Sequence, residues 1–147
     1  MIKSFIEAWN INAPKLLEWF AKTPQTEYSE YAAIWRAVIE KVINPYMGYF
    51  KELDASKTVT IDFGNYQGTL LFITPLDHYQ PNEHECVITC VDYGSCSGCD
   101  TLLGISGYDD EKLPDEQQLH DYMVLALNLL QRAKPVYEPL WLEGPCD

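Results

Sequence analysis

The sequence predicts an α+β fold, in which N-terminal helices and one long buried C-terminal helix pack on a small antiparallel sheet of three or four strands. Three observations predict it. Apolar residues recur at helical spacing up to residue 44, alternate with polar residues over much of 57–93, and surround the segment 122–130 on nearly all sides. We expect one domain spanning residues 1–147, a length that can bury a core of its own.

The first 45 residues are predicted to be helical. Apolar side chains share one face at positions 5, 6, 9, 16, 17 and 20, and a second stripe runs from Tyr28 through Trp35 to Val42. Thr23 followed by Pro24 is a start signal for the second helix. That helix should end at Asn44, because Pro45 disfavours helical geometry in the residue before it.

Alternating segments follow. Residues 57–63 and 68–76 are predicted strands, joined by the turn-forming residues Gly-Asn-Tyr-Gln at 64–67. A loop over 77–84 leads to a third strand at 85–93 and a tight turn of small residues at 94–100. Residues 101–108, TLLGISGY, could form a short fourth strand. An antiparallel meander is the simplest topology for these strands.

A long helix is predicted near the C-terminus. Asp115 and Gln118 have the spacing of a capping box, and the helix should run to about Ala133, just before Lys134-Pro135. Because its middle is apolar almost all round, we expect it to lie between the sheet and the N-terminal helices. The remaining tail is punctuated by proline and should be extended, with Trp141 docked.

Composition and charge limit the function. No apolar run approaches the roughly 20 residues of a membrane span, and the N-terminus lacks the apolar core of a signal peptide, so we expect a cytoplasmic protein with reduced or metal-bound thiols. Residues 1–76 carry 7 Lys/Arg and 8 Asp/Glu, whereas residues 77–147 carry 3 and 14. This acidity disfavours direct nucleic-acid binding and favours a basic protein surface as partner, although surface acids can simply keep a domain soluble.

Four of the five cysteines lie in residues 84–100, HECVITCVDYGSCSGCD. On a strand, Cys86 and Cys90 would lie about 13 Å apart and could not both bind one zinc ion. Cys96 and Cys99, separated by Ser-Gly, can point two thiolates at one ion. Cys90 is the nearest third ligand and His84 the first choice for the fourth, so the sequence predicts a zinc site. Alternative fourth ligands are Asp100, His120 and Cys146.

Other interpretations of the cysteines carry less weight. A redox pair usually lies at a helix N-terminus, whereas CDTLLGISGY looks like strand or loop. Disulfides are disfavoured in a reducing compartment, and Cys86 is expected to be a small buried apolar residue. The motifs HExxH, G-x-S-x-G and the P-loop are absent. We therefore predict a structural zinc rather than a catalytic one.

Acidic residues precede and open the last predicted helix: Asp109, Asp110, Glu111, Asp115 and Glu116. The simplest interpretation is that the last two complement the helix dipole and the others are solvated. The functional interpretation is an anionic ridge that imitates a phosphate backbone and occupies the basic groove of a nucleic-acid enzyme.

The segment VDYGSCSGCDTL, residues 91–102, resembles a signature of small bacteriophage and prophage proteins. The match covers about a tenth of the chain. It implies a phage source and thus the host cytoplasm, where small acidic proteins often act in host takeover or against host defence. Some anti-CRISPR proteins, which inhibit the guide-RNA-directed DNA nuclease, are similar in size and acidity, and one of them contains zinc. The resemblance supports Cys96 and Cys99, with Asp100 as an addition, as the site.

These observations favour a binding protein over an enzyme. The first hypothesis is an acidic, zinc-stabilised phage-type inhibitor that binds a host nucleic-acid enzyme, such as a CRISPR nuclease, and blocks its engagement of nucleic acid. The alternative is a small metal-dependent hydrolase or nuclease, with a zinc-bound water at Cys96 and Cys99. A third possibility is a soluble domain with reduced core cysteines and neither role.

Overall fold

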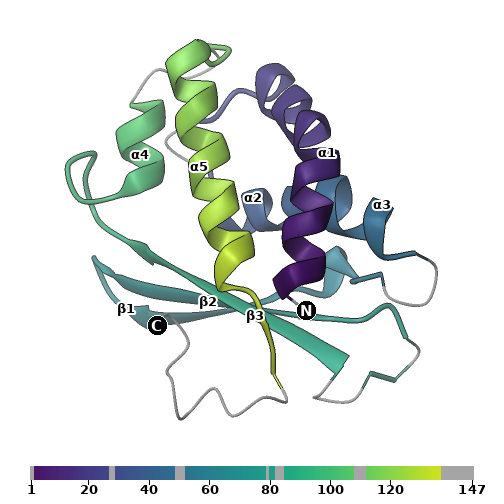
Figure 1. Cartoon of the computed structure of the whole chain (residues 1–147). Coiled ribbons are helices and arrows are strands. Elements are labelled where there is room, and N and C mark those ends of the chain that lie inside the picture. Colours follow the sequence, from purple (N-terminus) through teal and green to yellow (C-terminus); the bar gives the residue numbers. More distant parts are fainter. Residues whose placement is uncertain are drawn as a thin grey trace.

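The computed structural model describes residues 2–26, 29–48, 52–78, 80–81, 85–107 and 112–136. It confirms the α+β class: helices cover one face of a four-stranded antiparallel sheet (Figure 1). The strands are β1 (Val59–Gly64), β2 (Gly68–Pro75), β3 (Cys86–Tyr93) and β4 (Lys134–Pro135), adjacent in that order. The main helices are α1 (Ile2–Lys22), α2 (Tyr31–Val38), α4 (Thr101–Ser106) and α5 (Glu116–Arg132).

The second helix begins and ends later than predicted. It starts at Tyr31, and just before it the Thr26 N–H donates to the Ser29 hydroxyl (2.8 Å) and the Ser29 N–H to the Thr26 carbonyl (3.0 Å). Pro45 does not end it at Asn44. The chain passes through a π-helical turn, η1 (Ile39–Ile43), into α3 (Asn44–Met47). The wider turn relieves the clash that a proline ring makes with the carbonyl four residues earlier in an α-helix.

The predicted meander is confirmed. A short 3₁₀ turn, η2 (Ala55–Lys57), precedes β1, and β1 and β2 form a hairpin in which Gly64 pairs with Gly68. The two backbones approach so closely there that a Cβ on Gly64 would lie 2.3 Å from the Gln67 carbonyl oxygen. The hairpin therefore needs glycine at this position.

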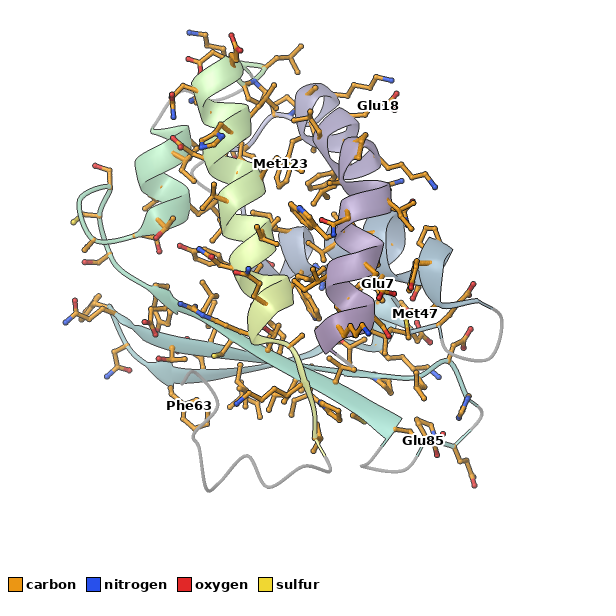
Figure 2. All side chains as sticks on the ribbon, in the orientation of Figure 1. Glu7, Glu18, Met47, Phe63, Glu85 and Met123 are labelled. Atoms are coloured by element: carbon orange, nitrogen blue, oxygen red, sulfur yellow. The ribbon has the colours of Figure 1, made fainter. Side chains whose placement is uncertain are left out.

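The two faces of the sheet have different neighbours. Phe72, Val87 and Val91 face the helices and belong to the main core, and the Thr89 hydroxyl donates to the Leu129 carbonyl of α5 (2.7 Å). Leu71, Ile88 and Cys90 form a second, smaller cluster. Because side chains alternate along a strand, this cluster lies on the opposite face. Phe63 points from β1 toward the same side and is 61% exposed (Figure 2).

The long C-terminal helix packs as a central element. It contacts α1, α2, α4 and β3, and Tyr122 stacks on Phe20 of α1 with ring centroids 5.2 Å apart. Figure 1 shows α5 and α1 side by side above the sheet. The helix is not buried all round, because Val124 is 44% exposed. Trp141 and the rest of the tail from residue 137 lie outside the described residues.

Residues 101–106 form helix α4, so the prediction of a strand there is wrong. Asp100 caps the helix by accepting a hydrogen bond from the Leu103 N–H (3.0 Å), and Gly107, with φ of +63°, follows its last residue. The fourth strand is β4 instead, which pairs with Val87 and Ile88 of β3. Within the described part of the chain, no helix has the length and apolar character needed to cross a membrane.

Candidate functional site

The turn after β3, residues 94–100, is organised by one carboxylate. Asp100 is buried, and it accepts hydrogen bonds from the Gly94 N–H (2.9 Å) and the Leu103 N–H (3.0 Å). Gly94 packs directly on the other end of the turn, since a Cβ there would lie 2.5 Å from the Cys99 carbonyl oxygen. These contacts explain why glycine and aspartate flank the two cysteines in the sequence.

Cys96 and Cys99, the cysteine pair, meet at the surface of this turn. Both are exposed free thiols, and their Sγ atoms are 2.8 Å apart. The Cys96 N–H also points at Cys99 Sγ (3.2 Å). The hydrogen bond from the Cys96 thiol, followed by that from the Cys96 backbone, lowers the pKa of Cys99 below its ordinary value.

The other predicted zinc ligands do not join the pair in the described structure. Cys90 is fully buried among Leu71 and Ile88 and is disulfide-bonded, so it presents no thiolate in this state, and the expectation of a reduced thiol is wrong for this residue. His84 lies outside the described residues. Throughout the described ranges, no three His, Cys, Asp or Glu side chains form a group that could hold a metal ion. Two ligands are therefore placed for zinc, which usually takes four from the protein in a structural site and three in a catalytic one.

A cleft of about 510 Å³ lies beside the turn. Its wall includes Tyr93, Gly94 and Asp100 from the turn region, Glu30 and Tyr31 from the start of α2, and parts of β1 and β2. Asp62 of β1 lines it as well, together with Phe72 of β2. Residues 91–102 thus form one side of the cleft, and its other sides come from distant parts of the sequence.

Tyrosines and carboxylates are hydrogen-bonded around this cleft. The Tyr93 hydroxyl donates to the Asp62 carboxylate (2.6 Å), and this bond, more than burial, raises the pKa of Tyr93. The Tyr31 hydroxyl accepts from the Leu102 N–H (3.0 Å). Burial raises the pKa of Tyr31, and the charge of Asp100 adds to the effect. Both phenols therefore stay neutral at physiological pH.

The acidic ridge is described only in part. Asp115 and Glu116 are exposed at the start of α5, whereas Asp109, Asp110 and Glu111 lie outside the described residues. Asp115 has a structural role, because its carboxylate accepts from the Gln118 N–H (2.8 Å), and the Gln118 side chain accepts from the Asp115 N–H (3.0 Å). The predicted capping box is therefore confirmed, and the ridge stays a prediction.

Comparison with known proteins adds no relative, since no family model, curated protein or solved structure matches this chain.

The cleft itself was not predicted from the sequence. Tyr31 and Asp62 give no local signal, because each belongs to an ordinary helix or strand pattern. Tyr93, Gly94, Asp100 and Leu102, which line the cleft, all belong to the segment VDYGSCSGCDTL at residues 91–102.

Proposed function

We propose that this protein is a small acidic inhibitor of phage type, which binds a basic surface of a host nucleic-acid enzyme and blocks its engagement of nucleic acid. The observation that carries the proposal is the cleft. Its lining combines the carboxylates of Glu30 and Asp62 with the aromatic rings of Tyr31, Tyr93 and Phe72. That combination suits a cationic side chain, and arginine above all.

Arginine fits this chemistry for two reasons. Its planar guanidinium binds carboxylates through paired hydrogen bonds, and its face stacks on aromatic rings. Glu30 makes no capping bond to the helix that it precedes, so its carboxylate can serve a ligand. Arginine and lysine also line the nucleic-acid grooves of most enzymes that bind DNA or RNA. The charge of −12, concentrated after residue 76, would attract such a groove.

Zinc belongs to the proposal as a structural ion at the cysteine pair. Two exposed free thiols in contact are suitable donors. The remaining ligands would come from outside the described residues, where the predicted ligand His84 lies. An ion held there would stiffen the turn that supplies Tyr93, Gly94 and Asp100 to the cleft. Catalytic zinc chemistry has no specific support from the described residues.

The first test measures binding of a nona-arginine peptide by titration calorimetry at low and at physiological salt. We expect binding that weakens with salt, because the screening length for exposed charges falls from about 30 Å at about 0.01 M to about 8 Å at physiological salt. Asp62→Asn and Glu30→Gln should each weaken it several-fold. Glu40→Gln is the matched control, since Glu40 is exposed, has the same charge and lies outside the cleft. Equal affinities for all four proteins would exclude the cleft as the binding site.

The inhibitory part of the proposal is tested with a guide-RNA-directed DNA nuclease. Added protein should reduce both DNA binding and cleavage, and Asp62→Asn should need a higher concentration for the same effect. Unchanged cleavage at saturating protein would exclude this nuclease as the target. No peptide binding at any salt concentration would contradict the wider proposal of a basic partner.

A further inference from the structure

The cysteine pair has a geometry close to that of a disulfide. Its sulfur atoms are 2.8 Å apart, against about 2.05 Å in a disulfide. The Cys99 N–H donates to the Cys96 carbonyl (3.1 Å), which closes a β-turn. The ends of such a turn have Cα atoms less than about 7 Å apart, and a disulfide needs roughly 4.4–6.8 Å. The bond can therefore form by a small movement within the turn.

The surroundings of the pair permit that movement. Cys96, Ser97, Gly98 and Cys99 are all exposed, and a Cβ built on Gly98 would meet no other atom within 4 Å. The ends of the turn, in contrast, are held by the buried Asp100 carboxylate. The tip can change shape while its base stays in place, so oxidation need not disturb the fold.

The pair also has a nucleophile. A thiolate, not a thiol, attacks a disulfide, and both sulfurs of the pair are exposed, so a small disulfide can reach them. The main objection to redox chemistry was the expectation of strand or loop after Cys99. That expectation is wrong, because residues 101–106 form the short helix α4.

We infer that Cys96 and Cys99 form a thiol–disulfide exchange site, which reduces low-molecular-weight disulfides such as oxidised glutathione and becomes oxidised to an intramolecular disulfide. The inference rests on the cysteine pair alone, so it stands or falls independently of the proposed inhibitor function. It also gives the pair a second state. An oxidised pair has no thiolates, so zinc and the disulfide exclude each other.

The exchange proceeds in two balanced steps. The Cys99 thiolate attacks one sulfur of the small disulfide, whose S–S bond breaks, and the departing thiolate takes a proton from water. The Cys96 thiol then loses its proton and attacks the Cys99 sulfur of this mixed disulfide. The Cys96–Cys99 bond forms and the second small thiol leaves. Two electrons pass from the protein to the small disulfide, which becomes two thiols.

The test uses the full-length reduced protein after removal of metal with a chelator, and its zinc content is measured before that step. The protein is equilibrated in glutathione buffers of increasing oxidation, free thiols are alkylated, and peptide masses are determined. We expect Cys96 and Cys99 to lose their alkylation together, in one two-electron step. Cys96→Ser should stop at a glutathione adduct on Cys99, because the second attack is missing. Cys99→Ser should likewise stop at an adduct, on Cys96.

Cys86→Ser is the control, since it changes a cysteine on β3 and should leave the titration of the pair unchanged. The inference is overturned if both cysteines of the pair remain alkylated in the most oxidising buffer. It is also overturned if they form only separate glutathione adducts and never the internal disulfide. The titration of the unmodified sequence decides the matter even if a serine variant fails to fold.

Discussion

At the scale of single residues, the Asp100 carboxylate holds both ends of the turn after β3. The sequence offered it as an alternative zinc ligand, yet its carboxylate is buried and accepts two backbone N–H groups, from Gly94 and Leu103. Such bonds satisfy donors that folding removes from water. The carboxylate therefore joins the end of β3 to the first turn of α4 and keeps the cysteine pair at the surface.

Replacing this residue gives a direct test. Asp100→Ala should lower the free energy of unfolding by about 1–3 kcal/mol, because two N–H groups lose their acceptor. The stability of Asp100→Asn should lie between those of the unmodified protein and Asp100→Ala, since an amide offers one acceptor oxygen in place of two. Asp77→Ala is the control for loss of an exposed carboxylate and should change stability by less than about 0.5 kcal/mol. Urea unfolding measures all three, and an Asp100→Ala value equal to the control would contradict the role.

The sequence could predict some contacts at this scale and not others. The short C-S-G-C spacing forces Cys96 and Cys99 together in any turn, and the structure brings their sulfurs to 2.8 Å. Whether Cys90 can reach the pair depends on which face of the sheet it occupies. It lies in the small cluster on the face opposite the helices. Tyr31 meets Leu102 across 71 positions of sequence, a contact that no local pattern could reveal.

At the scale of elements, the start signals had mixed outcomes: the capping box at Asp115 was confirmed, whereas Thr23-Pro24 does not start α2. The spacing of Asp115 and Gln118 predicted the start of α5, and the structure confirms both hydrogen bonds of the capping box. The pattern of α4 was misleading, because the helix is short and Gly104 within it disfavours a helix, and Asp100 was not considered as its cap. A cap acts on the backbone directly, whereas an apolar pattern depends on what covers it.

Asp115 allows the cap and the charge to be separated. Asp115→Ala should lower the free energy of unfolding by about 1 kcal/mol, the usual cost of losing an N-cap. Asp115→Ser should restore most of that stability, because serine also caps, while the negative charge remains absent. If the acidic ridge binds a basic partner, both variants should bind nona-arginine more weakly. If both bind it as the unmodified protein does, Asp115 is a structural cap and not part of a binding surface. Thermal unfolding and titration calorimetry give the two readouts.

At the scale of the whole molecule, the fold class was predictable because it depends on long, repeated patterns. Helical spacing, strand alternation and the apolar last helix all pointed to the same α+β arrangement. The packing of α5 beside α1 was harder to predict from the sequence. It places Tyr122 against Phe20 with nearly parallel rings, and Val124 toward solvent, which an almost entirely apolar segment does not indicate.

This packing predicts how the whole protein responds to alkaline pH. Burial raises the pKa of Tyr122 to about 12, whereas in the unfolded chain it is about 10. Between these values the unfolded state releases the phenolic proton and the native state keeps it, so stability must fall as pH rises from 10 to 12. Tyr122→Phe keeps the ring but removes the ionisable proton, so the free energy of unfolding should decrease less between pH 10 and 12. Tyr66→Phe is the control at an exposed site and should leave this decrease unchanged. Urea unfolding at stepped pH measures this, and identical slopes for both variants would show that Tyr122 ionises equally in both states.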